Sequence, residues 1–390
     1  MIDFDFVLGG VPRFAAEAAW ARRLVERFAR ELPYSRATAI WGRRPTLADI
    51  EGQAAGLLVV ADPEAFLVPG AARRLLDRIA GGQCDAALPV TNEPWCEEAR
   101  GAPSFPYHTP SNLEEGAAAL ARDNAGSKAS RALSPRSPVF AVRRDALQGL
   151  PAGIELDRVP EEVRLRGGRV DVDPGAYLHR YGEMDRQPRA DLAGKIPDGA
   201  RAVLDVGCAR GATAGPLRRA GVRRIVGIEP NAADTEEARR HYDLVIDLPL
   251  EKVREEFPRE FDAVFFGDVL EHLIDPSAAL ARVRPWLSER GRVVATVPHV
   301  GHWSILSDLL EGRFDYIPYS ILSGTHLRFF TRQTLKDLFE ACGYRIETIE
   351  ATRFAASPIG RRKLERLAAL PGASEDLDVV EFLVVARADG

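Results

Sequence analysis

The stretch Ala202-Val-Leu-Asp-Val-Gly-Cys-Ala-Arg-Gly211 decides the fold of the second half of this 390-residue chain. Ala202–Val206 is an apolar run typical of a buried strand, and it leads through a glycine turn into a helix that carries Leu217 and Arg218. Such a turn lets a ligand approach the backbone, and the helix start offers free N–H groups. No Gly-Lys-Ser/Thr follows, which excludes a P-loop, and the spacing differs from that of a dinucleotide-binding Gly-x-Gly-x-x-Gly. We therefore expect a cradle for a small molecule.

Acidic residues follow the next predicted strands. Arg224–Glu229 ends in an acid about 20 residues beyond the glycine turn, a position from which a carboxylate accepts hydrogen bonds from ribose hydroxyls. The third and fourth strands of this series lead to Asp247 and Asp268. One acid alone would be weak evidence, but the ordered set indicates a single cofactor pocket.

Apolar β-rich runs alternate with helical patterns in two series, which is typical of α/β architecture with mainly parallel sheets. The length also favours two domains, and we place them at residues 1–180 and 181–390, joined by the polar stretch Tyr181–Ala200. Thr91–Pro138 is longer than most structural loops and is predicted to be an insertion with one helical patch, Leu113–Arg122. The predicted strands are Phe4–Leu8, Thr38–Trp41, Gly56–Ala61, Ala86–Val90, Val139–Val142 and Arg169–Val172, then Ala202–Val206, Arg224–Glu229, Leu244–Ile246, Phe261–Phe266, Arg292–Val297, Tyr344–Glu350 and Val379–Ala386; predicted helices include Ala15–Arg30 and Gly70–Ala80.

Composition excludes several classes of protein. Hydrophobic residues make up 46% of the chain, yet no apolar run approaches the roughly 20 residues that span a bilayer. The first residues lack the features of a signal peptide, so we expect a cytoplasmic protein. A net charge of -5 disfavours a nucleic-acid partner. The four cysteines, Cys84, Cys96, Cys208 and Cys342, lack metal spacing and are expected to be free thiols.

From about residue 185 to 350 the motifs resemble class I S-adenosylmethionine-dependent methyltransferases, with Val379–Ala386 as the last strand. This resemblance implies a Rossmann-like, seven-stranded domain. Within that family, the branch common in bacterial surface-polysaccharide gene clusters is similar in three segments, which are Val297-Pro-His-Val-Gly-His-Trp-Ser304, Gly312-Arg-Phe-Asp-Tyr316 and Thr325-His-Leu-Arg-Phe-Phe-Thr331. The resemblance thus implies S-adenosyl-L-methionine as the cofactor and a glycan or its precursor as the acceptor.

The resemblance also implies residue roles. Asp205 and Gly207, with Cys208 and Gly211 of the same loop, would bind at the methionine end of the cofactor. Glu229 would hold the ribose, Asp247 would approach the adenine amine, and Asp268 would lie between cofactor and acceptor. The chain departs from the family pattern in two places, with Ala209 at the middle glycine of the loop and Pro298-His299 where Pro-Asn is usual.

Methyl transfer from a sulfonium is an in-line displacement, and a hydroxyl acceptor must also lose a proton. A histidine near the transfer axis would accept that proton. His272, His299, His302 and His326 all fall in the family's active-site motifs, and our first candidates for the base are His272 and His302.

Other interpretations of these residues stay open. Asp268, Glu271 and His272 have the i, i+3, i+4 spacing that places side chains on one helix face, which could bind a divalent metal. The favoured alternative is that Glu271 and His272 cap and orient the helix while Asp268 hydrogen-bonds cofactor or substrate. His326 could simply order the loop at Arg328–Phe330. Five aromatic residues could wall a substrate pocket or belong to the core; they are Phe314, Tyr316, Tyr319, Phe329 and Phe330.

The first half of the chain resembles a shortened nucleotide-sugar glycosyltransferase domain of the GT-A kind. In that family an Asp-x-Asp holds a divalent cation, and here the match is Asp62-Pro-Glu64. His179 would match a late histidine, and Glu161 or Glu162 a base. The short length, the Glu at the second metal position and the lack of a uridine-binding pattern depart from the family. We therefore favour a degenerate domain that binds or positions a glycan, or that pairs subunits into a homo-oligomer, over an active transferase.

Three functional hypotheses follow. The first is an enzyme that methylates a sugar hydroxyl, or an amine or glycan terminus, in surface-polysaccharide assembly. The second is a bifunctional glycosyltransferase and methyltransferase. The third is a scaffold that binds ligands without turning them over.

Overall fold

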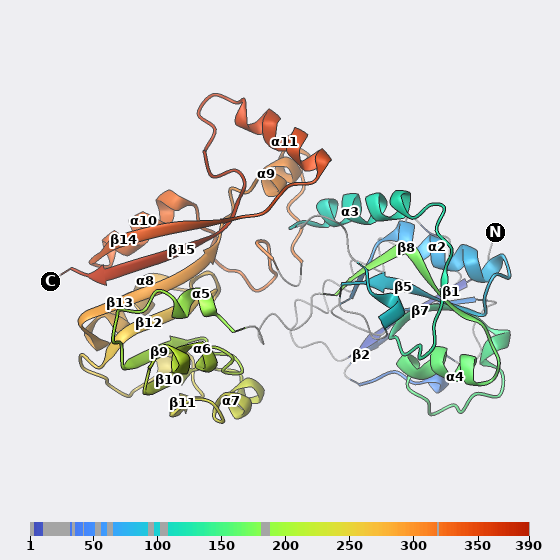
Figure 1. Cartoon of the computed structure of the whole chain (residues 1–390), viewed down its shortest axis with the longest axis horizontal. Helices are drawn as coiled ribbons and strands as arrows, with labels where there is room; N and C mark the ends of the chain where they lie inside the picture. The colour runs from blue at the N-terminus through green and yellow to red at the C-terminus, as the bar shows by residue number, and fades with distance from the viewer. Residues whose placement is uncertain are drawn as a thin grey trace. The chain divides into compact units, whose positions relative to one another are not determined.

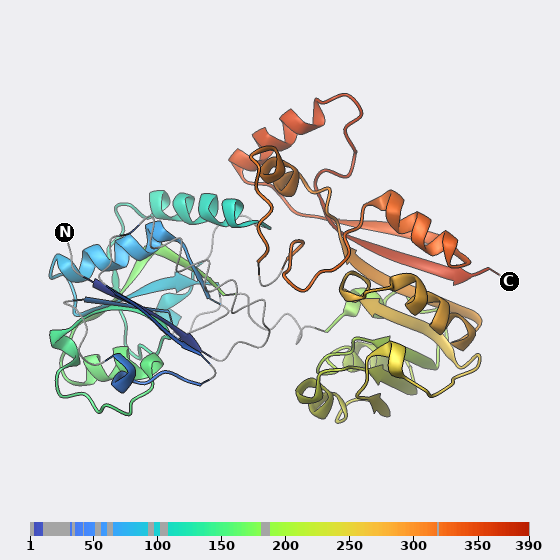
Figure 2. The ribbon, with the colours of Figure 1, turned by 180° about the vertical axis from the view of Figure 1, so that it is seen from behind.

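The computed structural model describes residues 4–10, 32, 36–41, 43–50, 56–60, 65–92, 97–101, 108–180, 188–317 and 320–389. The chain divides into two compact units, each with its own sheet (Figures 1 and 2). The first comprises Met1–Gly182 with Asp315–Tyr319 and Ser357–Ile359, and the second comprises Glu183–Phe314, Ser320–Ala356 and Gly360–Gly390. Among the described residues, no helix is both long and apolar enough to cross a bilayer.

The first unit contains an eight-stranded mixed sheet in the order β2-β1-β3-β7-β5-β8-β4, with β6 paired to β8. β1 is parallel to β2 and β3, whereas β7 is antiparallel to both β3 and β5. β5 is parallel to β8, and β8 is antiparallel to β4 and β6. The prediction of a mainly parallel sheet therefore holds only in part for this unit, because a strand buried on both faces shows the same apolar run in either direction. The strands are β1 Phe4–Gly10, β2 Arg36–Trp41, β3 Gly56–Val60, β4 Ala65–Leu67, β5 Ala86–Thr91, β6 Ser130–Arg131, β7 Val139–Arg143 and β8 Val170–Arg180.

Three helices of this unit pack on the sheet, namely α2 Pro69–Ala80, α3 Pro110–Asp123 and α4 Val159–Leu165. Proline at the first helical position favours the start of α2, since its missing N–H would have no partner there. Thr109 caps α3 by accepting a hydrogen bond from the Asn112 N–H. The predicted helix Ala15–Arg30 lies outside the described residues.

The second unit contains a seven-stranded sheet in the order β11-β10-β9-β12-β13-β15-β14 (Figure 1). β11, β10, β9, β12 and β13 are parallel, and β15 enters antiparallel between β13 and β14. All seven predicted strands are found, although β13 begins at Leu287, earlier than expected. The strands are β9 Ala202–Val206, β10 Arg224–Ile228, β11 Leu244–Ile246, β12 Phe261–Gly267, β13 Leu287–Pro298, β14 Tyr344–Arg353 and β15 Val379–Ala388; the helices along this part of the chain are α5 Ala190–Ala193, α6 Ala214–Arg219, α7 Ala232–Ala238, α8 Pro276–Val283, α9 Trp303–Leu310, α10 Arg332–Ala341 and α11 Pro358–Ala368.

Helices cover both faces of the second sheet. Val203 of β9 belongs to an apolar cluster with Leu217 of α6, whereas its neighbour Leu204 belongs to a second cluster with Phe339 of α10. Alternate side chains of one strand therefore bury against opposite layers, as expected for a parallel strand covered on both faces. The carboxyl ends of the parallel strands remain the natural place for a ligand.

Gly227 of β10 has no room for a side chain, because the side chains of Cys208 and Tyr242 pack over it. A Cβ there would lie 2.5 Å from Cys208 Sγ and 3.1 Å from a ring carbon of Tyr242. We expect Gly227→Ala to lower the free energy of unfolding by roughly 1–3 kcal/mol through overpacking. A decrease in the thermal unfolding midpoint would measure this loss.

Removing the sulfur with Cys208→Ala should restore part of that loss in the double variant, since the two sites share the clash. Gly215→Ala in α6 is the matched control, because its Cβ would meet only Arg219 Nη1 at 3.5 Å. An unchanged midpoint for Gly227→Ala would contradict the described packing of β10.

Candidate functional site

The loop after β9 turns sharply at three residues with positive φ. Gly207 has φ 72°, Ala209 φ 44° and Gly211 φ 81°. A Cβ on Gly207 would lie 2.5 Å from Val269 Cγ2, so the loop passes close to the turn that follows β12. Ala209 adopts the left-handed region despite its side chain, which costs roughly 1–2 kcal/mol. The departure from glycine at this position therefore leaves the shape of the loop intact.

Glu229 joins the ends of β9 and β10. Its carboxylate accepts hydrogen bonds from the Ala209 N–H at 3.0 Å and from the Asn231 N–H at 2.8 Å, and its side chain is buried. Asp247 follows β11 directly, is more than half exposed, and lies 3.0 Å from Arg239 Nη2. The two acids thus occupy successive strand ends, as the sequence predicts, in environments of different polarity.

Asp205 lies at the floor of the loop and is fully buried. The Tyr242 hydroxyl donates a hydrogen bond to Asp205 Oδ2 at 2.6 Å. Burial raises the pKa of Asp205 to about 6, although the Tyr242 hydrogen bond and the charge of Arg189 act in the opposite direction. No sequence motif singles out Tyr242, which lies 37 residues away in the chain. The Cys208 thiol packs beneath the loop beside Gly227. A ligand in the loop would therefore contact the backbone of Cys208 rather than its thiol.

Asp268 follows β12 with φ 55°, again in the left-handed region. Its N–H donates to Thr296 Oγ1 at 3.1 Å, and the Thr296 hydroxyl donates to Asp268 Oδ1 at 3.0 Å. The other carboxylate oxygen accepts a hydrogen bond from Arg189. Thr296 and Arg189 therefore hold the Asp268 carboxylate, and the predicted grouping of Asp268 with Glu271 and His272 on one α-helix face is not formed. The chain here makes a short 3₁₀ turn, Leu270–His272, rather than an α-helix.

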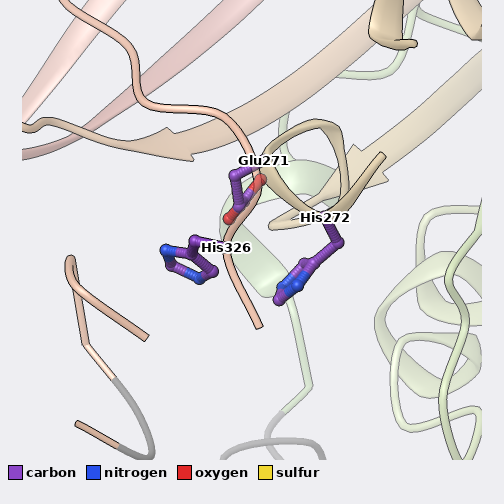
Figure 3. A group of neighbouring side chains, drawn as sticks. All are labelled: Glu271, His272 and His326. Atoms are coloured by element: carbon purple, nitrogen blue, oxygen red, sulfur yellow. The ribbon is translucent and has the colours of Figure 1, made fainter. Parts of the chain in front are cut away.

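Glu271, His272 and His326 form a cluster in which ligand atoms from all three lie within 4.8 Å of one another (Figure 3). The Glu271 side chain is 1% exposed, and neither carboxylate oxygen has a hydrogen-bond partner among the described residues. Its backbone carbonyl accepts hydrogen bonds from the Leu327 and Arg328 N–H groups, which bring His326 beside the turn. Sequence motifs contain all three residues, but the pairing of His272 with His326 depends on this contact between distant segments.

Both histidines of the cluster are held in one tautomer. His272 Nδ1 lies 3.1 Å from the Thr325 carbonyl, and His326 Nδ1 lies 2.9 Å from the Ile321 carbonyl. A carbonyl oxygen can only accept, so each neutral ring carries its proton on Nδ1 and a lone pair on Nε2. Burial lowers the pKa of both rings, to about 4 for His326. Burial, followed by the charge of Asp268, raises the pKa of Glu271 well above its usual value.

The other candidate histidines lie apart from this cluster. His302 caps α9, where its Nδ1 accepts a hydrogen bond from the Ser304 N–H at 3.3 Å. His299 Nδ1 lies 3.3 Å from the Phe330 carbonyl, and the ring packs against Phe382. Of our two first candidates for the base, the structure thus brings only His272 into the cluster.

The aromatic residues that could wall a substrate pocket lie in different environments. Phe314 and Phe329 pack edge to face at 5.8 Å, and Phe330 is buried in the core of the sheet. Tyr316 is half-buried, and Tyr319 lies outside the described residues. The Phe314 and Phe329 pair is the part of this set that a ligand could reach, because Phe314 is 39% exposed.

In the first unit, the candidate metal residues Asp62 and Glu64 lie outside the described residues. His179 of β8 is paired with Phe66 of β4, and its Nδ1 lies 3.3 Å from the Tyr177 hydroxyl. Burial lowers the pKa of His179 to about 3, so the ring is neutral. The candidate bases Glu161 and Glu162 lie in the first turn of α4, where Glu162 is 3.8 Å from Arg158.

Comparison with known proteins identifies the family. A family model described as a methyltransferase domain matches residues 177–349. A ubiquinone biosynthesis O-methyltransferase of Rhodopseudomonas palustris (strain HaA2) is 31% identical over 193 residues, which cover 47% of this chain and 70% of the relative. The chain belongs to the S-adenosylmethionine-dependent methyltransferases.

Two further proteins are similar to this methyltransferase. The ubiquinone biosynthesis O-methyltransferase of Nitrobacter winogradskyi is 29% identical over 268 residues, which cover 64% of this chain and 97% of the relative. The crystal structure of an S-adenosylmethionine-dependent methyltransferase from Mesorhizobium loti is similar with a TM-score of 0.36 and 20% identity, and covers 50% of this chain and 95% of the other. The Nitrobacter relative is named as a methyltransferase, in agreement with the family model.

The methyltransferase unit fits the cofactor of its family on the chemistry of its side chains. Carboxylates stand at the ends of four neighbouring strands, where they suit a molecule that carries ribose hydroxyls, amines and a sulfonium cation. Burial raises the pKa of Asp205, and a nearby positive charge would favour the ionised form of this carboxyl. A cationic cofactor would supply such a charge.

The raised pKa of Asp205 has a consequence for stability. The folded state binds a proton at this group between about pH 4 and 6 while the unfolded state does not, so the group's contribution to stability falls as the pH rises through that range. Asp205→Asn keeps an acceptor for Tyr242 and removes the buried charge. We expect the variant to be more stable than wild type at pH 7.5, by on the order of 2 kcal/mol, and to lose that advantage by pH 4.5. Thermal unfolding midpoints at both pH values, without ligand, test this; an equal difference at both would contradict it.

Proposed function

We propose that this methyltransferase transfers a methyl group from S-adenosyl-L-methionine to a hydroxyl of a small-molecule or glycan acceptor. The observation that carries the proposal is the pair of imidazoles, His272 and His326, which lie in one cluster with Glu271 and each carry a lone pair on Nε2. A hydroxyl must lose its proton as it is methylated, and a neutral imidazole is a suitable acceptor for that proton. The relatives' names, which specify O-methyl transfer, support the same class of acceptor.

The cofactor roles follow the strand ends. We assign Asp205 and the Gly207–Gly211 loop to the methionine end, Glu229 to the ribose and Asp247 to the adenine. Asp268 would lie where the methyl group is transferred. When bound, the cofactor supplies an electrophilic methyl group, and the protein's part is to align the acceptor and exclude water.

The proton of the acceptor would pass to Nε2 of His272 or His326. Because Nδ1 of each ring is hydrogen-bonded to a carbonyl, the positive charge that develops on the ring is partly stabilised by that carbonyl. Burial, followed by the charge of Asp268, raises the pKa of Glu271 well above its usual value, which favours the neutral form of this carboxyl beside the two rings.

A second candidate role for the same cluster is to hold a divalent metal. The observation in its favour is the buried Glu271 carboxylate, which lies beside two imidazole nitrogens and accepts no hydrogen bond from the part of the chain that the structure describes. One carboxylate and two imidazoles are common ligands of transition metals. Metal analysis separates the two roles, since only the second requires a stoichiometric ion.

The acceptor is proposed to be a sugar hydroxyl of a surface-polysaccharide glycan or its precursor, on the motifs at Val297–Ser304 and Thr325–Thr331. The relatives are named for ubiquinone biosynthesis and O-methyl transfer, which favours a hydroxyl of a ubiquinone precursor instead. Incubation of the protein and cofactor with a panel of glycans and ubiquinone precursors, followed by mass spectrometry for a methyl increment, decides between them. Methylation of ubiquinone precursors alone would overturn the glycan assignment, and methylation of an amine alone would overturn the hydroxyl proposal.

The variants His272→Gln and His326→Gln, assayed with an acceptor from that panel, test whether a histidine of the cluster is the general base. We expect loss of one of the two rings to lower kcat by roughly 10²–10⁴-fold, while affinity for the cofactor changes less than threefold. Because burial lowers the pKa of both rings, to about 4 for His326, the acidic limb of the wild-type kcat profile should lie below the ordinary imidazole pKa. The measurements are kcat against pH and titration calorimetry with S-adenosylmethionine.

The control for these variants is His241→Gln, since His241 is exposed beyond α7 and lies outside the cluster. Near-normal kcat in both cluster variants would exclude a histidine base. Activity that disappears on chelation and returns with a stoichiometric divalent metal would favour the metal role instead.

For the first unit we propose a domain that binds or positions a glycan or nucleotide sugar. His179 supports this proposal, because it pairs with Phe66, two residues after the candidate metal ligand Glu64. Titration with nucleotide sugars in the presence of manganese should give saturable binding that Asp62→Asn weakens at least fivefold. Heat release that is equal in wild type and variant would remove Asp62 from this role, and absence of binding would leave methyl transfer as the proposed activity of the whole chain.

A further inference from the structure

Arg189 lies beside Asp268 in a well-defined position, although no sequence motif singles it out. Its Nη2 lies 2.8 Å from Asp191 Oδ2 and 2.9 Å from Thr296 Oγ1, and its Nη1 donates to Asp268. The side chain is 24% exposed, so these contacts are screened less than those of a surface ion pair. The position is set by Leu192, three residues on, which is buried in the core of the methyltransferase unit.

Arg189 fixes the orientation of Asp268. The left-handed backbone at Asp268 is disfavoured for a residue with a side chain, and it is retained where neighbouring contacts hold it. Thr296 bonds both the N–H and one carboxylate oxygen of Asp268, while Arg189 bonds the other oxygen and also Thr296. The three side chains therefore form a closed ring of hydrogen bonds at the ends of β12 and β13.

Arg189 also supplies the positive charge beside Asp268. Glu381 of β15 lies 3.8 Å from its Nη2, and Asp191 is hydrogen-bonded to its Nε and Nη2. Burial and the charge of Asp268 raise the pKa of Glu381 to about 8. For Arg189 itself, burial opposes the charged form, but its acidic partners outweigh burial and raise its pKa. Three acids thus surround one guanidinium.

We propose that Arg189 sets how strongly the donor site prefers the sulfonium cofactor over its neutral thioether product, S-adenosylhomocysteine. The inference rests on the proposed function, because it requires Asp268 to lie near the reacting sulfur. In the transfer, the electron pair of the broken S–C bond stays on sulfur, an acceptor oxygen pair forms the new C–O bond, and the proton goes to the histidine cluster. The positive charge on sulfur is lost in this step.

The guanidinium limits the attraction between Asp268 and the sulfonium. An Asp268 carboxylate without Arg189 would bind the charged donor more tightly than the neutral product, since attraction acts only on the donor. Such binding stabilises the ground state more than the transition state, where the sulfonium charge is already decreasing. Arg189 therefore acts as a specificity-determining residue that works through Asp268.

The test is titration calorimetry of S-adenosylmethionine and S-adenosylhomocysteine, each with wild type, Arg189→Gln, Arg189→Lys and Asp268→Asn. The ratio of the product Kd to the donor Kd should rise roughly three- to tenfold in Arg189→Gln. It should stay within about twofold of wild type in Arg189→Lys, which keeps the charge, and fall below wild type in Asp268→Asn.

The matched control is Arg292→Gln, because Arg292 is similarly exposed (31%) and pairs with Glu347 on the same sheet. An unchanged ratio in Arg189→Gln, or an equal rise in Arg189→Lys, would overturn the inference. Asp268→Asn gives an independent reading if Arg189→Gln fails to fold. Failure of the wild type to bind either ligand would refute the proposed function itself, whereas binding with an unaltered ratio in the variants would refute only the role of Arg189.

Discussion

The parallel pairing of β11, β10, β9, β12 and β13 is the constraint on which the rest of the methyltransferase unit depends. Parallel strands all end at one edge of a sheet, so residues that are far apart in the sequence become neighbours there. Asp205, Glu229, Asp247 and Asp268 lie at or just beyond these ends. The acidic character of that edge follows from the register of the sheet rather than from any one loop.

Burial, more than the number of acidic residues, determines the negative charge at this edge of the sheet. Asp205, Glu271 and Glu381 all have raised pKa values because burial penalises their ionised forms. A hydrogen bond from Tyr242 offsets this penalty for Asp205, whereas no described residue offers such a bond to the Glu271 carboxyl. Burial therefore weakens the acidity of several neighbouring carboxyl groups in this region.

The sequence predicts the parts of the site that are encoded locally. A glycine turn after an apolar strand is a local pattern, and so the loop at Gly207 and the acid at Glu229 could be placed without coordinates. Contacts between distant segments of the chain could not be predicted in this way. Tyr242 reaches Asp205 and Arg189 reaches Asp268 across 37 and 79 residues of chain, and their pairing depends on the sheet register. The helical spacing expected for Asp268 and His272 failed because the turn after β12 is 3₁₀.

The position of β15 has a consequence for the order in which the unit assembles. β15 is later in the chain than β14, yet it lies between β13 and β14 and pairs with both. β14 therefore cannot join the sheet when it is synthesised, and is added only once the strand that begins at Val379 is available. Until then β13 has an open edge, which is a site for incorrect pairing. Glu381 is carried by that strand, so the electrostatic environment of Asp268 and Arg189 is completed only once β15 has paired with β13.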